Sequence, residues 1–148
     1  MTKFALVFAL SALSVWAAAA GPLASDAEID AAERAPLPAM AGAMKWNEPS
    51  APFNVIGNIY YVGTVEVGAY LITSPKGHIL IDGVLAQTAP QIVTNIRTLG
   101  FDIRDVKFLL NSHAHIDHAG GLAGLQRASG AAMVASAGDR PTLEAGEI

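Results

Sequence analysis

The sequence predicts an α/β fold built on a parallel sheet. Three short apolar runs, at residues 78–81, 106–110 and 132–135, are separated by two segments with helical periodicity. Strands that alternate with helices are joined by right-handed crossovers and therefore run parallel. Short, almost wholly apolar strands are typical of a sheet that is covered on both faces. The length of 148 residues is that of one domain.

The composition excludes several classes of function. A net charge of −4 argues against nucleic acid as a partner, because such proteins show a basic stripe. The chain has no Cys, which excludes a disulfide framework, a Cys-based zinc site, an iron–sulfur cluster and a thiol nucleophile. Charged residues make up only 15% of the chain, and the shortfall is concentrated at the N-terminus.

Residues 1–20 have the pattern of a secretory signal peptide. Lys3 is the single charged residue, an apolar run extends from Phe4 to Trp16, and four alanines precede Gly21. The alternative is a membrane anchor, but a span needs about 20 apolar residues and this run is shorter. We therefore expect export to the periplasm, with cleavage near Ala20 and no stable membrane association afterwards.

The next segments are predicted in chain order. Residues 21–52 are rich in Ala and Pro and are expected to form an extended arm, with a short helix over residues 26–34. The domain proper is expected over residues 53–148. Two β-rich runs, at residues 54–62 and 65–73, predict a hairpin that turns at Gly63-Thr64. A turn at residues 74–77 leads into the strand that ends at Asp82.

A helix is expected after this strand. Thr88 and Gln91 have the spacing of a capping box, and Pro90 suits the first turn. Gly100 marks the C-terminal stop. Beyond the strand at residues 106–110, a polar loop runs from Asn111 to Gly121, followed by a helix over residues 122–128 and the last strand.

Three of the four His in the chain lie within six residues, at His113, His115 and His118, with Asp117 among them. Imidazole and carboxylate groups are ligands that suit zinc. An extended backbone puts His113 and His115 on one side, while Asp117 and His118 can face a second point. Two metal ions, each completed by residues from elsewhere, are the natural interpretation. The alternative is a polar surface loop that happens to hold three His.

This pattern resembles the zinc signature of the metallo-β-lactamase superfamily, His-x-His-x-Asp-His after an apolar strand. The likeness to the third subclass of class B β-lactamases, whose zinc sites use no Cys, extends from Trp46 to the end of the chain. The residues that carry it are Trp46-Asn47, Pro49, Pro52-Phe53, the run from Gly57 to Gly63, the run from Gly77 to Gly83, and Asn111-Ser112-His113-Ala114-His115.

The resemblance implies a ligand set and a mechanism. His113 and His115 would bind the first zinc, and Asp117 and His118 the second, each with one later His. A hydroxide shared by the two zinc ions, oriented by the catalytic residue Asp117, would attack the β-lactam carbonyl. The bound water would ionise to this hydroxide near neutral pH, because the metal lowers the pKa of its bound water.

The family fold is an αββα sandwich, and the resemblance places its two remaining His ligands beyond residue 148. The chain is therefore expected to be the N-terminal half of that sandwich, as a fragment or a natural truncation. One sheet face is expected to be an uncovered apolar patch. Residues 21–148 alone are not expected to hydrolyse β-lactams at a useful rate.

Several other residues have a structural and a functional interpretation. Asp82, at a strand end, is expected to support the zinc ligands, as the matching Asp does in the superfamily. Asn111 and Ser112 are expected to hydrogen-bond the loop, and His78 to be structural. Trp46 suits either the core or a wall of the substrate groove. The tyrosines at positions 60, 61 and 70 are expected to pack on the sheet.

The leading interpretation is thus a periplasmic zinc β-lactamase that takes small β-lactam substrates. A second is another hydrolase of the same superfamily, acting on a thioester or a lactone. A third is a zinc-binding protein without catalytic activity. The export pattern and the segment from Trp46 to Phe53 favour the first.

Overall fold

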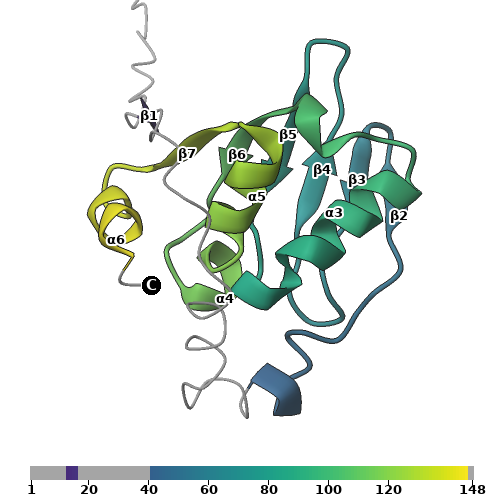
Figure 1. Cartoon of the computed structure of the whole chain (residues 1–148), viewed down its shortest axis with the longest axis horizontal. Coiled ribbons are helices and arrows are strands. Elements are labelled where there is room, and N and C mark those ends of the chain that lie inside the picture. Colours follow the sequence, from purple (N-terminus) through teal and green to yellow (C-terminus); the bar gives the residue numbers. More distant parts are fainter. Residues whose placement is uncertain (1–12, 17–40, 147–148) are drawn as a thin grey trace, which may run out of the picture.

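The computed structural model describes residues 13–16 and 41–146 and shows one sheet with helices packed on it (Figure 1). The strands follow the order β1-β7-β6-β5-β4-β3-β2 across the sheet. Their bounds are Leu13–Trp16 for β1, Phe53–Ile56 for β2, Ile59–Tyr61 for β3, Tyr70–Ile72 for β4, His78–Ile81 for β5, Val106–Leu110 for β6 and Ala132–Ser136 for β7. Strands β5, β6 and β7 are parallel, as predicted, and the other pairs are antiparallel.

Four α-helices and two short 3₁₀ helices have bounds in the described residues. They are η1 (Ala86–Thr88), α3 (Ala89–Thr98), η2 (Ile103–Asp105), α4 (Ile116–Ala119), α5 (Leu122–Ser129) and α6 (Arg140–Ala145). Helices α3 and α5 lie side by side across one face of the sheet (Figure 1). None of the described helices is long and apolar enough to cross a membrane.

The core lies between these two helices and the sheet. Leu71, Leu80 and Leu109 are opposite one another on neighbouring strands and are fully buried. Ile92, Ile96 and Leu125 meet them from the helices and are equally buried. Each such side chain stabilises the fold by about 1.5–3 kcal/mol relative to exposure. This packing fixes the strand ends that carry the polar loops.

The opposite face of the sheet is also apolar. Tyr70 pairs with Ile81, and Ile81 with Leu110, so their side chains share this face. Phe108 and Tyr70 are 41% and 38% exposed here, whereas the leucines of the helix-covered face have no exposure. The expectation of an uncovered apolar face is confirmed for the residues that the structure describes.

The predicted hairpin is placed differently in the structure. The tight turn is at Gly57-Asn58, between β2 and β3, and residues 62–69 form a loop that joins β3 to β4. Gly63 serves close packing instead of a turn, since a Cβ there would lie 2.5 Å from the backbone nitrogen of Ala69. The prediction of one strand over residues 65–73 was therefore wrong in its first half.

The predicted capping box is also wrong. Thr88 is the N-cap of α3, but its hydroxyl donates to the carbonyl of Leu85 at 2.7 Å, and Gln91 bonds Asn95 instead. The preceding 3₁₀ turn places Thr88 in helical backbone geometry, which turns its side chain away from the helix start. Pro90 in the first turn and the left-handed Gly100 after the helix are as predicted.

Two loops are more ordered than expected. The polar loop after β6 contains the single-turn helix α4. In the expected arm, residues 41–43 are helical, and the backbone nitrogen of Trp46 donates to the carbonyl of Ala41 at 2.9 Å. The arm is extended only further along the chain, where Pro49 forms an isolated antiparallel β-bridge with Thr64.

Most of the predicted signal peptide and the predicted helix over residues 26–34 lie outside the described residues. Within the first twenty residues, β1 is described as an edge strand antiparallel to β7. Removal of residues 1–20 would leave β7 as the edge of the sheet. Export remains a prediction.

Candidate metal centre

Two backbone loops meet at the carboxyl ends of β5 and β6. The nitrogen of Gly83 donates to the carbonyl of His118 at 2.8 Å, and the nitrogen of Gly121 donates to that of Val84 at 2.9 Å. Asp82 and Val84 have positive φ angles of 61° and 56°, which is uncommon for residues other than Gly. These contacts bring the loop after β5 against the loop that carries the His cluster.

This close approach requires Gly121, and Gly121→Ala tests it. A Cβ at this position would lie 2.0 Å from the carbonyl oxygen of Gly83, so the two loops must separate. We expect the substitution to lower the free energy of unfolding by about 1–3 kcal/mol, measured by urea denaturation. Gly138→Ala is the control, because its nearest neighbour would be 3.7 Å away. Equal unfolding midpoints for the two variants would contradict this packing.

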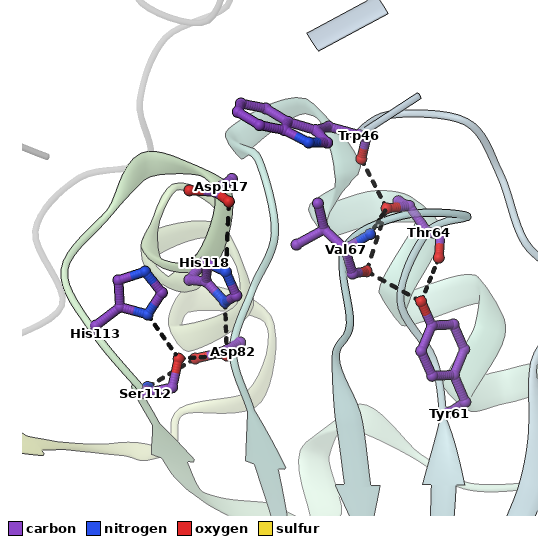
Figure 2. Close-up of polar contacts among 9 residues, drawn as sticks. All are labelled: Trp46, Tyr61, Thr64, Val67, Asp82, Ser112, His113, Asp117 and His118. Atoms are coloured by element: carbon purple, nitrogen blue, oxygen red, sulfur yellow. Dashed lines mark hydrogen bonds and ion pairs between the residues drawn. The ribbon is translucent and has the colours of Figure 1, made fainter. Parts of the chain in front are cut away.

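Asp82 is the centre of the polar network. Its side chain is buried, and Oδ1 accepts the backbone N–H of Ser112 at 2.8 Å. Oδ2 accepts the hydroxyl of Ser112 at 2.7 Å and lies 3.0 Å from Nδ1 of His118 (Figure 2). The expectation that Asp82 lies beside the histidine loop and supports it is met by these contacts.

Three of the predicted ligand residues are brought together. Donor atoms of His113, Asp117 and His118 all lie within 4.8 Å of one another. Nε2 of His118 is 3.4 Å from Oδ2 of Asp117. Two ligands at about 2.0–2.2 Å from one tetrahedral metal ion stand about 3.3–3.6 Å apart. The separation of this pair therefore fits a shared metal ion without rearrangement.

His115 is exposed at the edge of this cluster. Its ring centroid is 4.6 Å from that of His113, and the rings of His113 and His118 are 4.2 Å apart. The three imidazoles thus form a contiguous group, as the spacing in the sequence predicts. His115 stands outside the tight set formed by the other three ligand residues.

The donor set fits a borderline-hard divalent ion such as zinc. The group consists of imidazole nitrogens and one carboxylate, and no Cys is available in the chain. His118 directs Nδ1 to the Asp82 carboxylate, which is the outer hydrogen bond that orients metal-binding histidines. Its Nε2 is then left for the metal.

A second network holds the segment of Trp46 beside the site. The hydroxyl of buried Thr64 donates to the carbonyl of Trp46 at 2.7 Å, and the Tyr61 hydroxyl lies against the carbonyls of Thr64 and Val67, the latter at 3.2 Å. Burial raises the pKa of Tyr61, so this donor keeps its proton. The Trp46 ring is partly buried against the core and lies at the same end of the sheet as Asp117 (Figure 2).

The family sequence model described as "Metallo-beta-lactamase superfamily" matches residues 62–147 of the chain. The chain belongs to the metallo-beta-lactamase superfamily. Its members are metallo-hydrolases that bind divalent metal ions, and the His/Asp/His cluster lies inside the matched region. The expectation of an α/β chain that forms the N-terminal part of this fold is confirmed.

Solved structures of this superfamily resemble the chain closely. Rm3 metallo-beta-lactamase is 56% identical with a TM-score of 0.60, and the match covers 62% of this chain and 34% of that chain. BJP-1, a subclass B3 metallo-beta-lactamase of Bradyrhizobium japonicum, is 45% identical with a TM-score of 0.68. This match covers 71% of this chain and 40% of that chain. The resemblance to the third subclass is thus confirmed.

A curated relative has another named activity. "N-acyl homoserine lactonase AttM" of Azorhizobium caulinodans is 34% identical, over 39% of this chain and 30% of its own length. The chain therefore spans well under half the length of each of these relatives. The match establishes a hydrolase superfamily and leaves the substrate open.

The sequence located the cluster and its support at Asp82 but missed one buried polar residue elsewhere, Asn95. His78 lies at the far end of β5 from Asp82, where Nδ1 accepts the backbone N–H of Ser74 at 3.3 Å, in agreement with a structural role. Asn95, buried on α3, was missed. Its amide donates to the carbonyls of Val62 and Ser50 at 3.0 and 3.2 Å. A polar residue on the apolar face of a predicted helix was the available signal.

Proposed function

We propose that these residues are part of a zinc hydrolase that opens the β-lactam ring, with two metal ions in the complete site. The supporting observation is the likeness to subclass B3 β-lactamases, at 45–56% identity over 62–71% of this chain. The lactonase relatives are less identical and match a shorter stretch. Lactone hydrolysis is therefore the second candidate, and a zinc-binding protein without catalytic activity is the third.

Each residue of the cluster has a proposed task. The imidazoles of His113, His115 and His118 would hold divalent metal, together with the Asp117 carboxylate. Bound metal would lower the pKa of a water molecule and polarise the substrate carbonyl. Asp117 would also orient the attacking water by accepting a hydrogen bond from it on its carboxylate. Asp82 keeps His118 in the required orientation through the Nδ1 contact.

Trp46 is proposed to form an apolar wall beside the cluster. Its backbone is tied to Thr64, so the ring position is set by the loop between β3 and β4. Val65 in that loop is 42% exposed and offers a second apolar contact. An apolar wall next to a few convergent polar groups is the usual composition of a small-molecule site.

Turnover of two substrates tests the assignment. The complete gene product is assayed with a chromogenic cephalosporin and with an N-acyl homoserine lactone, before and after chelation and with zinc restored. We expect chelator-sensitive cephalosporin opening that exceeds lactone opening. Preference for the lactone would support the second candidate, and metal-independent activity or none would overturn the proposal. Residues 21–148 are assayed in parallel and are expected to show no useful turnover, because they supply only part of the proposed ligand set.

Export is proposed from the N-terminal pattern alone. Lys3, the apolar run and the alanines before Gly21 suit a signal peptidase. N-terminal sequencing of the protein recovered from the periplasm is expected to begin within a few residues of Gly21. A retained Met1 would show instead that the segment is an anchor.

A further inference from the structure

The hydroxyl of Ser112 lies between Asp82 and His113. Its Oγ is 2.7 Å from Oδ2 of Asp82 and 3.2 Å from Nδ1 of His113. The same Oδ2 atom is 3.0 Å from Nδ1 of His118. One carboxylate oxygen is therefore joined to His118 directly and to His113 through a single hydroxyl (Figure 2).

The number of protons fixes the direction of each hydrogen bond. An ionised carboxylate only accepts, so the single hydroxyl proton of Ser112 goes to Asp82. The Ser112 oxygen then presents a lone pair to His113, whose Nδ1 must carry a proton to use it. Nδ1 of His118 donates to Asp82 for the same reason. Both neutral rings are left with an unprotonated Nε2.

We propose that Ser112 is a positioning residue that fixes the tautomer and ring orientation of His113 by linking its Nδ1 to Asp82. Metal-binding histidines typically donate their second ring N–H to a fixed acceptor, which prepares the other nitrogen for the metal. For His118 that acceptor is Asp82, and for His113 it is the Ser112 hydroxyl. The zinc titration rests on the proposed function, whereas the tautomer measurement is independent of it.

Ser112→Ala removes the hydroxyl with little other change, because Ser112 is exposed and its backbone N–H still reaches Asp82. Ser112→Thr keeps the hydroxyl and is the conservative variant. Ser136→Ala is the matched control, since the hydroxyl of Ser136 also donates to a carboxylate, that of Asp139, at 2.8 Å, away from the histidines.

Nitrogen-15 NMR of the metal-free chain reads the tautomers directly, at a pH where the imidazoles are neutral. We expect His113 and His118 to have protonated Nδ1 in the wild type. In Ser112→Ala, His113 is expected to become a mixture of tautomers while His118 stays unchanged, and Ser112→Thr restores the wild-type spectrum. An unchanged His113 spectrum in Ser112→Ala would overturn the proposal.

Zinc titration against a chromophoric chelator gives the second readout. We expect Ser112→Ala to weaken zinc binding about 10–100-fold, the usual effect of losing an outer hydrogen-bond partner, with Ser112→Thr and Ser136→Ala unaffected. Equal affinity in Ser112→Ala and the wild type would contradict the positioning role of Ser112. A complete wild-type protein that binds no zinc would refute the proposed function, whereas the tautomer measurement would still decide the role of Ser112.

Discussion

Asp117→Ala and His118→Ala are each expected to weaken zinc binding by more than the about 10–100-fold that loss of an outer hydrogen-bond partner costs. Nε2 of His118 and Oδ2 of Asp117 are 3.4 Å apart, so each variant removes a donor atom from one proposed metal position. In the complete protein, the same substitutions are expected to abolish most hydrolysis. Competition with a chromophoric chelator measures the affinity.

His78→Ala is the matched control for this pair. It also removes an imidazole, but His78 lies about 13 Å along β5 from Asp82, at about 3.3 Å per residue. Its ring packs edge-on against Phe101, 5.4 Å between centroids, so a modest loss of stability is the expected effect. Equal loss of zinc affinity in all three variants would contradict the placement of the metal.

Asp82→Ala is expected to have the second large effect. The buried carboxylate accepts three hydrogen bonds, and its removal leaves the backbone N–H of Ser112 and Nδ1 of His118 without this acceptor. A fully buried donor without a partner costs about 1–3 kcal/mol, and these partly buried donors are expected to cost less. We therefore expect a lower free energy of unfolding in urea and a zinc affinity reduced by about 10–100-fold.

Asp82→Asn separates the loss of the hydrogen-bond acceptor from the loss of the negative charge. Asn tolerates the left-handed backbone of this position, φ 61°, better than Ala does. It keeps one acceptor but loses the negative charge that holds His118. We expect Asp82→Asn to unfold closer to the wild type than Asp82→Ala, while zinc affinity still falls. Wild-type zinc affinity in both variants would show that Asp82 does not support the cluster.

The elements that the sequence predicted well are those with a strong local pattern. Residues 78–81 and 106–110 are short apolar runs bounded by turns, and the structure has β5 and β6 at those bounds. The helix after Thr88 was recognisable from its periodicity and from Gly100. The histidine loop was recognisable because four ligand residues stand within six positions.

Other features depend on contacts that no local pattern reveals. The β-rich stretch from residue 54 to residue 73 contains three glycines, and the tight turn is at the first of them, Gly57. The bonds of Ser112 to Asp82 join residues 30 positions apart. The same holds for Asn95, whose partners lie on the arm and on the loop after β3.

Anomalous diffraction at the zinc edge tests the metal centre most directly. Crystals of the protein grown with zinc are expected to show a peak about 2.0–2.2 Å from Nε2 of His118 and Oδ2 of Asp117. A second peak is expected beside His113 and His115. Zinc bound only elsewhere in the protein, with the His113–His118 loop free of anomalous density, would contradict the assignment of these four residues as ligands.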